Sequence, residues 1–433
     1  MSITKKLAAG VVVLGLALAG CGSPAPQQGA AGGSGGSDGP VTIRFAWWGN
    51  DTRNRLTTEV IAAFEAANPD IKVTAEPGEW SGYWDKLATQ VAGNDEPDVI
   101  QMDEKYIAEY GERGLLMDLE AAGLTFDKFM DGTVDTGRVD GKLFGINSGI
   151  NAPVVVANPD VFEAAGVAIP DDKTWTYDSL AQVAKEVTDK SPAGTYGTQN
   201  MSYVEPVLRA WLRQHDKDQF NPEGMGFEPA DLTGFFDWGM KLQREGAAPT
   251  AAETSEDMGK SLDQTMAATN KIGMSVYWSN QITALQKASG ADMQLLRLPS
   301  EAGSADKAAL WYKASMLWSG SARTEHPEAV AKFIDYLANN PEAGKIMGTE
   351  RGVPANKDVR AAVEPDMSDV DKKVVAYLDS IESELGPVPM VTPVGGGSFG
   401  QVQMRMVQDL VFERKDSLGA AQGLYDEVKG LIS

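Results

Sequence analysis

The chain has 433 residues, enough for two or three domains of ordinary size. It carries 38 Lys plus Arg against 61 Asp plus Glu, a formal net charge of −23. A surface this acidic repels phosphate backbones and anionic lipid headgroups, so the composition argues against nucleic-acid binding. One cysteine and two histidines exclude an intrachain disulfide and leave little room for a metal centre, so we expect no cofactor.

The N-terminal residues predict export and a lipid anchor. Two lysines precede an apolar run from Leu7 to Ala19, which is typical of a signal peptide and too short for a membrane span. The run ends in Leu-Ala-Gly-Cys, which matches the bacterial lipobox, whose cysteine is acylated. We therefore predict a signal peptide over residues 1–20, lipid attachment at Cys21 and a flexible tether over residues 21–40. The expected location is the extracytoplasmic face of a bacterial cell membrane.

The first part of the body alternates expected strands and helices. Three strand–helix units follow one another at intervals of about 25–30 residues, which favours a parallel sheet with helices on both faces. Hydrophobic patterning predicts strands at Thr42–Ala46, Ile71–Ala75 and Val99–Met102, and helices at Arg53–Asn68, around Trp84–Val91 and from Lys105.

The rest of the body continues in the same mixed pattern. No Pro- and Gly-rich linker divides it, which favours two lobes that the chain enters more than once. Further strands are expected at Leu143–Ile146, Val154–Ala157, Lys271–Val276, Met293–Leu298 and Lys313–Trp318, and helices after Thr176 and Pro327, at Phe235–Arg244 and Leu262–Ala268, and near the C-terminus.

Catalytic and metal-binding motifs are weak. Gly396–Gly400 matches the G-x-S-x-G nucleophile elbow, but in that hydrolase order a histidine follows the serine, and none follows here. Neither His215 nor His326 has a ligand-spaced partner. A carboxylate pair for glycoside hydrolysis stays open, because nothing in the sequence selects one among the many acids.

Tryptophans near expected strand ends are the positive signal. In open α/β sheets, ligands bind beyond the carboxyl ends of the strands. Aromatic faces pack against the C–H faces of a pyranose, while carboxylates and amides bind its hydroxyls, so this composition favours a sugar site. Each ring could equally belong to the core, which is the better interpretation for Trp84 and Trp238. The tryptophans at such positions are Trp47, Trp48, Trp80, Trp84, Trp278 and Trp311.

Four motifs carry a family resemblance. Phe64–Val73 is FEAANPDIKV, Gly141–Ile146 is GKLFGI, Asn158–Gly166 is NPDVFEAAG and Arg351–Asn356 is RGVPAN. In this order and spacing they resemble the family 1 extracellular solute-binding proteins, the sugar receptors of ABC importers to which the maltodextrin-binding proteins belong. The resemblance covers the body from residue 41 to the end.

The resemblance implies an α/β, two-lobed, periplasmic-binding-protein-like fold with discontinuous lobes joined by a hinge and mostly parallel sheets flanked by helices. By analogy, the chain would cross between lobes near Asn147–Pro153, near Leu295–Pro299 and near Ser319–Glu325. The implied boundaries are 41–150 with 299–320 for the first lobe and 151–298 with 321–433 for the second.

The resemblance also implies a set of residues around a sugar in the cleft, with Trp278 stacked on the ring. Asn151 stands where maltodextrin receptors place an acidic hydroxyl acceptor, which argues against a maltodextrin. For Arg351 a surface ion pair, and for the loop before Phe399 a helix entry, stay open as alternatives. The implied sugar-binding residues are Trp48, Asp51, Asp103, Asn151, Tyr203, Trp278, Asn280, Arg351 and Phe399.

The function that these expectations imply is sugar binding without catalysis. A monomeric receptor would close around a sugar, which we expect to be an oligosaccharide, and deliver it to the membrane subunits of an ABC permease. Two alternatives stay open: a cell-surface carbohydrate-active enzyme and a sugar-sensing accessory protein. The identity and length of the sugar depend on the placement of single polar groups, which a sequence does not give.

Overall fold

The computed structural model describes residues 39–49 and 51–432. The predicted signal peptide, Cys21 and nearly all of the tether therefore lie outside the described residues. Residues 40–433 cluster as one compact unit. No helix in the described ranges has the length and apolar character that a membrane span requires.

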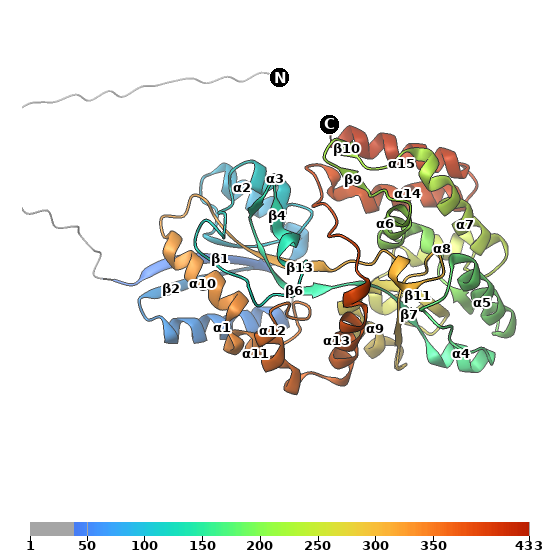
Figure 1. Ribbon diagram of the computed structural model, residues 1–433, viewed down its shortest axis with the longest axis horizontal. Helices are drawn as coiled ribbons and strands as arrows, with labels where there is room; N and C mark the ends of the chain where they lie inside the picture. Colours follow the sequence, from blue (N-terminus) through green and yellow to red (C-terminus); the bar gives the residue numbers. More distant parts are fainter. Residues whose placement is uncertain (1–38, 50, 433) are drawn as a thin grey trace, which may run out of the picture. The chain divides into compact units, whose positions relative to one another are not determined.

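A five-stranded sheet organises what we call the first lobe (Figure 1). Its strands lie in the order β2-β1-β3-β13-β6. β1 (Val41–Trp48) pairs in parallel with β2 (Ile71–Gly78) and β3 (Val99–Met102). β13 (Lys313–Gly320) runs antiparallel to both β3 and β6 (Ile146–Asn151). The first three predicted strands are confirmed.

Both faces of this sheet are covered by helices. Alternate side chains of a strand point to opposite faces, so Phe45 and Trp47 enter one core and Ala46 and Trp48 another. Phe333 packs edge-on against Phe45, with ring centroids 5.4 Å apart. The first face is covered by α1 (Asp51–Ala67) and α10 (Pro327–Asn339), and the second by α2 (Trp80–Ala92) and α3 (Ile107–Glu112).

A four-stranded sheet organises the second lobe, in the order β12-β7-β11-β8. β7 (Pro153–Ala157) is wholly buried and runs antiparallel to β11 (Ile272–Trp278) and β12 (Gln294–Leu296). β8 (Tyr196–Thr198) is parallel to β11. Antiparallel pairs thus occur in both sheets, and the expectation of mostly parallel sheets is wrong. The physical reason is that strands returning from the other lobe enter a sheet from the opposite end.

The remaining helices complete the layers around the two sheets. Thr176 caps α5 as predicted, since its Oγ1 accepts a hydrogen bond from the Ser179 amide at 3.1 Å. The predicted helix at Leu262–Ala268 is wrong, because only one 3₁₀ turn forms there, at Leu262–Gln264. The other helices are α4 (Pro159–Ala165), α5 (Tyr177–Lys190), α6 (Glu205–Gln214), α7 (Thr233–Arg244), α8 (Ala251–Asp257), α9 (Ile282–Ser289), α11 (Pro341–Met347), α12 (Lys357–Val363), α13 (Asp369–Ile381), α14 (Phe399–Val411) and α15 (Ser417–Leu431).

Short strands add two small hairpins. β4 (Arg138–Val139) pairs with β5 (Lys142–Leu143), and β9 (Phe220–Asn221) pairs with β10 (Gly224–Met225).

Two of the three crossings between the lobes differ from those implied by the resemblance. The first lies at Ala152, between β6 and β7, inside the predicted Asn147–Pro153. The second comes later than Leu295–Pro299, because Gln214 of the second lobe still donates hydrogen bonds to carbonyls of residues 299 and 308. Residues 299–312 therefore stay with the second lobe, and their assignment to the first is wrong.

The third crossing is also displaced. No crossing occurs at Ser319–Glu325, because α10 packs on β1, β6 and β13 and α11 packs on α1. The chain leaves the first lobe only between α12 and α13. Helix α13 belongs to the second lobe, because it contacts β12 and α9. The prediction that residues 321–433 all belong to the second lobe is therefore wrong for the part up to the end of α12, because the helices α10 to α12 pack in the first lobe.

Candidate functional site

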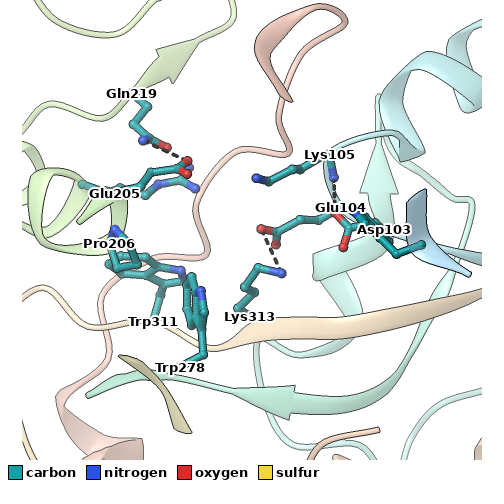
Figure 2. A pocket seen from close by; sticks show the side chains of 11 residues that line it. Asp103, Glu104, Lys105, Glu205, Pro206, Gln219, Trp278, Trp311 and Lys313 are labelled. Atoms are coloured by element: carbon teal, nitrogen blue, oxygen red, sulfur yellow. Dashed lines mark hydrogen bonds and ion pairs between the residues drawn. The ribbon is translucent and has the colours of Figure 1, made fainter. Parts of the chain in front are cut away.

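A cavity of about 230 Å³ lies where elements of the two lobes meet (Figure 2). We call it the central cavity. The loop after β3, the end of β11, the start of α6 and the segment entering β13 all reach it, so it lies beyond the carboxyl ends of strands from both sheets. Its lining residues are Trp80, Asp103, Glu104, Lys105, Glu205, Pro206, Arg209, Gln219, Trp278, Trp311 and Lys313.

Two indole rings form one wall of the central cavity. Trp278 and Trp311 meet edge to face, with ring centroids 6.3 Å apart and planes at 79°. The guanidinium carbons of Arg209 and Arg213 lie 5.7 and 5.5 Å from the Trp311 centroid, and Trp311 is buried. Trp278 is only half-buried, so its ring offers accessible apolar surface to a ligand. Figure 2 shows the two rings side by side, across the cavity from Asp103.

An ion pair stands opposite the rings. Lys313 Nζ lies 3.2 Å from Glu104 Oε1 and 5.4 Å from the Trp278 ring centroid. Burial raises the pKa of Glu104, against the opposing effect of Lys313. Burial alone would lower the pKa of Lys313, but Glu104, Asp103 and Glu205 together raise it. Lys313 therefore remains charged at neutral pH.

Three further polar side chains face the cavity with unused bonding capacity. Asp103 Oδ1 accepts the Lys105 backbone N–H at 3.0 Å, and Glu205 Oε1 accepts Gln219 Nε2 at 3.3 Å. The second oxygen of each carboxylate accepts no hydrogen bond from any described residue. The Lys105 ammonium has no hydrogen-bond or ion-pair partner in the part of the chain that the structure describes. The cavity thus combines acceptors and a donor with an aromatic face, as hydroxyl-rich ligands require.

A second cavity of about 460 Å³ shares Lys105 and Glu205 with the central cavity. Tyr203 and Tyr277 line it, and the Tyr277 hydroxyl lies 3.2 Å from that of Thr265. Burial raises the pKa of both tyrosines. Because two lining residues are common to both, this adjoining cavity extends the space for a ligand beyond one ring.

The structure brings some predicted site residues together and separates others. Asp103 and Trp278 line the central cavity, and Tyr203 lines the adjoining one. Trp48 is buried one layer behind, where its ring meets that of Trp80 at 5.1 Å. Asp51 is the exposed first residue of α1 and lines none of these cavities.

Asn151 and Asn280 line a different cavity, of about 370 Å³, between the end of β6, α9, α13 and the loop after α11. We call it the hinge cavity. Neither residue lines the central cavity.

Arg351 is not a cleft residue. Its side chain is 2% exposed, and it donates from Nε to Gln101 Oε1 at 3.0 Å and from Nη2 to Thr57 Oγ1 at 2.7 Å. The guanidinium also lies 5.0 Å from the Trp318 ring centroid. Arg351 therefore belongs to the core of the first lobe, and both the predicted second-lobe contact and the alternative of a surface ion pair are wrong.

Phe399 is buried as well. Its ring packs edge-on against Phe220 and Phe227, with centroids 5.8 and 6.2 Å apart. The alternative of a simple helix entry is the correct one, because Gly396–Ser398 form one 3₁₀ turn that leads into α14.

Sequence reasoning missed most of the polar lining. Trp80 and Trp311 carry the aromatic signal at strand and helix boundaries, but the resemblance did not place them in the site. Glu205, Arg209 and Gln219 give no signal, because only the packing of α6 and of the segment that follows it brings them to the cavity. No group of three or more His, Cys, Asp or Glu side chains in residues 39–49 and 51–432 is arranged to hold a metal ion.

Comparisons with known proteins match a family model and several relatives. A family model described as bacterial extracellular solute-binding protein matches residues 59–373. An uncharacterized lipoprotein of Streptomyces antibioticus is 32% identical over 194 residues, which are 43% of this chain and 40% of the relative. The arabinooligosaccharide-binding protein of Bacillus subtilis (strain 168) is 28% identical over 224 residues, 49% of this chain and 48% of the relative. The chain thus spans less than half the length of these two curated relatives.

Solved structures share the whole fold. A family 1 extracellular solute-binding protein from Alicyclobacillus acidocaldarius is 26% identical, with a TM-score of 0.74 over 92% of this chain and 100% of that one. A periplasmic oligogalacturonide-binding protein from Yersinia enterocolitica is 21% identical, with a TM-score of 0.75 over 90% of this chain and 98% of that one. The predicted two-lobed α/β fold is confirmed.

Proposed function

Because the chain belongs to the family of bacterial extracellular solute-binding proteins, we propose that it is a receptor that binds a carbohydrate and delivers it to an ABC-type permease. The name of the Bacillus subtilis relative, an arabinooligosaccharide-binding protein, supports a sugar as the solute. The adjoining cavity supports a ligand of more than one ring, since it continues the central cavity past Lys105 and Glu205.

One observation carries the proposal: the half-buried face of Trp278 shares a cavity with Asp103 and Glu205. The indole face packs on the C–H side of a pyranose, and the two carboxylates accept hydrogen bonds from its hydroxyl groups. Lys105, which has no ion-pair partner among the described residues, donates to a ring or hydroxyl oxygen. Lys313 stays paired with Glu104 and also contacts the ring of Trp278 through a cation–π interaction.

Binding is coupled to closure of the two lobes. Asp103 belongs to the first lobe and Glu205 to the second, so a sugar that contacts both binds most tightly when the walls are close. Such a ligand shifts the population toward the closed state by its difference in affinity for the two states. The closed state is the form that docks on the permease.

The protein acts outside the cytoplasm, held by a lipid. The lipobox that ends at Cys21 supports this, as does the similarity to a lipoprotein of Streptomyces antibioticus. Mass spectrometry of the N-terminal peptide from native membranes shows a diacylated Cys21 if this is correct, and an unmodified N-terminal sequence if it is wrong.

A thermal-shift screen of mono- and oligosaccharides, followed by calorimetry, tests the proposed function. We expect at least one sugar to bind with a dissociation constant near micromolar, about −8 kcal/mol. We infer binding without conversion, so reducing ends should not accumulate over hours with the bound sugar. Their accumulation would favour the carbohydrate-active enzyme, and the absence of binding by any sugar would refute the receptor.

A further inference from the structure

The hinge cavity lies on the other side of the crossing strands from the central cavity. β6 and β13 run between the lobes, with α3 and α6 on one side of them and α11 and α13 on the other (Figure 1). The central cavity is lined from α6 and the loop before α3, and the hinge cavity from α13 and the loop after α11. At about 370 Å³, the hinge cavity is within the size range of roughly 300–1,000 Å³ that is usual for small-molecule sites.

A buried amide without a partner faces this cavity. Asn151, the last residue of β6, is 4% exposed, and its Oδ1 is buried without a hydrogen-bond partner. The Asn151 Nδ2 likewise donates to no described residue. An unpaired buried amide costs about 1–3 kcal/mol. Since Asn151 lines the hinge cavity, a ligand with hydroxyl groups there offers this amide a hydrogen-bond partner.

The rest of the lining defines the chemistry of the ligand. The hydroxyls of Thr283 and Thr349 both donate and accept hydrogen bonds, while Leu56 and Val374 offer apolar surface. Neither lysine nor arginine is among the lining residues, so an anion gains no countercharge.

The acidic lining residues give little reason for a cation. Both oxygens of Glu350 accept hydrogen bonds from Arg53 Nε, at 3.0 and 2.8 Å, so its charge is already compensated. Asp371 Oδ2 accepts the Ser368 hydroxyl at 2.6 Å. A ligand with alternating C–H and O–H groups and no net charge matches this lining best.

We propose that the hinge cavity is a second binding site, which takes a small neutral polyol that contacts Asn151 and bridges the two lobes. The first-lobe wall comes from α1 and the loop after α11, and the second-lobe wall from α9 and α13. A polyol that touches both walls stabilises the hinge angle that brings them to this separation. Trp278 does not line the hinge cavity, so this proposal can be tested separately from the sugar site of the central cavity.

Saturation-transfer NMR with xylitol tests the proposal, with putrescine and succinate as cationic and anionic probes of similar length. We expect xylitol to receive saturation from the native chain and equally from the Trp278→Ala chain. Thr283→Phe places a bulky ring at an exposed position of α9 that lines the cavity, and should reduce the transfer at least fivefold. Ala284→Phe, at the next exposed position of the same helix but outside the lining, is the matched control and should leave the transfer unchanged.

A crystal soaked in xylitol gives the second readout, which does not depend on a variant that folds. The expected result is density for the polyol within hydrogen-bond distance of the Asn151 amide. Water alone in the cavity, transfer lost in Trp278→Ala, equal transfer in Thr283→Phe and Ala284→Phe, or stronger transfer to putrescine or succinate than to xylitol would each overturn the proposal.

Discussion

The rings of Trp278 and Trp311 meet edge to face at 6.3 Å, although the chain places them 33 positions apart in different segments. Trp278 ends β11 of the second sheet, and Trp311 stands two residues before β13 of the first. Both rings therefore belong to the second lobe, and Trp311 lies just before the chain crosses into β13. Trp311 is held between this contact and two arginines, which leaves Trp278 as the ring that a ligand can reach.

Trp278→Ala should weaken sugar binding at least tenfold, which corresponds to about 1.4 kcal/mol. The ring is half-buried at the edge of the hydrophobic core, so its loss removes the stacking surface and leaves the fully buried core residues in place. The melting temperature should therefore change little. Calorimetry with the sugar found in the screen, together with a thermal melt, measures both quantities.

Phe412→Ala is the control for that experiment, because Phe412 is a 40% exposed aromatic side chain outside the cavities described above. It should leave the sugar affinity unchanged. Equal affinities for the native chain and Trp278→Ala would remove Trp278 from the site.

Arg351→Met should destabilise the protein by about 2 kcal/mol or more without changing sugar affinity. The substitution leaves Gln101 Oε1 buried without its donor and removes the cation from the Trp318 ring. Urea denaturation gives the loss in unfolding free energy, and calorimetry gives the affinity. A large loss of affinity with unchanged stability would restore Arg351 to the cleft.

The outcome for Arg351 shows where sequence reasoning ends. Hydrophobic periodicity and the motif order predict the strands β1, β2 and β3 and the two-lobed fold, because these depend on local patterns. Whether Arg351 faces the cleft depends on the crossing after α12, which the packing of α10 on the first sheet decides. No local pattern distinguishes a helix that returns to the first lobe from one that enters the second.

The residues that line the central cavity also divide into those that the sequence predicts and those that only the fold reveals. Trp278 and Asp103 could be predicted because aromatic and acidic residues at strand ends are typical of ligand sites. Glu205, Arg209 and Gln219 could not, since their approach to the cavity depends on the placement of α6 and of the segment that follows it. Lys313 lies on a predicted strand, and only the fold shows that Glu104 is the carboxylate beside it.

Arg297→Met should destabilise the protein by about 3–5 kcal/mol, as expected when a buried charge network loses its central partner. Arg297 lies just after β12, with its side chain 6% exposed, and it binds Glu384 and Asp172 while donating to the Ser380 carbonyl at 2.9 Å. Its removal leaves two carboxylates without their countercharge and loosens α13. Urea denaturation measures the change. A loss below about 1 kcal/mol, the usual value of an exposed pair, would contradict this account.

The pKa of Glu104 predicts how stability depends on pH. Burial raises the pKa above the ordinary value of 4.5, so the folded protein holds this proton more tightly than the unfolded chain. The resulting stabilisation is complete below pH 4.5, and it is lost as the pH rises through the pKa that Glu104 has in the folded protein. The unfolding free energy of the native chain, relative to Glu104→Gln, should therefore fall as the pH rises from 4.5 through the folded pKa of Glu104.

Glu65→Gln serves as the control, because the unfolding free energy of the native chain relative to this variant should rise with pH. The Val73 backbone N–H, bonded to Glu65 Oε1 at 2.8 Å, lowers the pKa of Glu65 below 4.5. The stabilisation from the Glu65 carboxylate is present above pH 4.5, and it is lost as the pH falls through the pKa that Glu65 has in the folded protein. For each variant, the difference in unfolding free energy from the native chain is plotted against pH. If the two plots had slopes of the same sign, the claim that burial raises the pKa of Glu104 would be wrong.

The most direct test of the sugar receptor is a crystal structure of the protein with the tightest-binding sugar from the screen. We predict a sugar ring stacked on the indole face of Trp278, with Asp103 and Glu205, from opposite lobes, accepting hydrogen bonds from its hydroxyls. A sugar that contacts neither Trp278 nor Asp103, or that touches one lobe alone, would contradict the account.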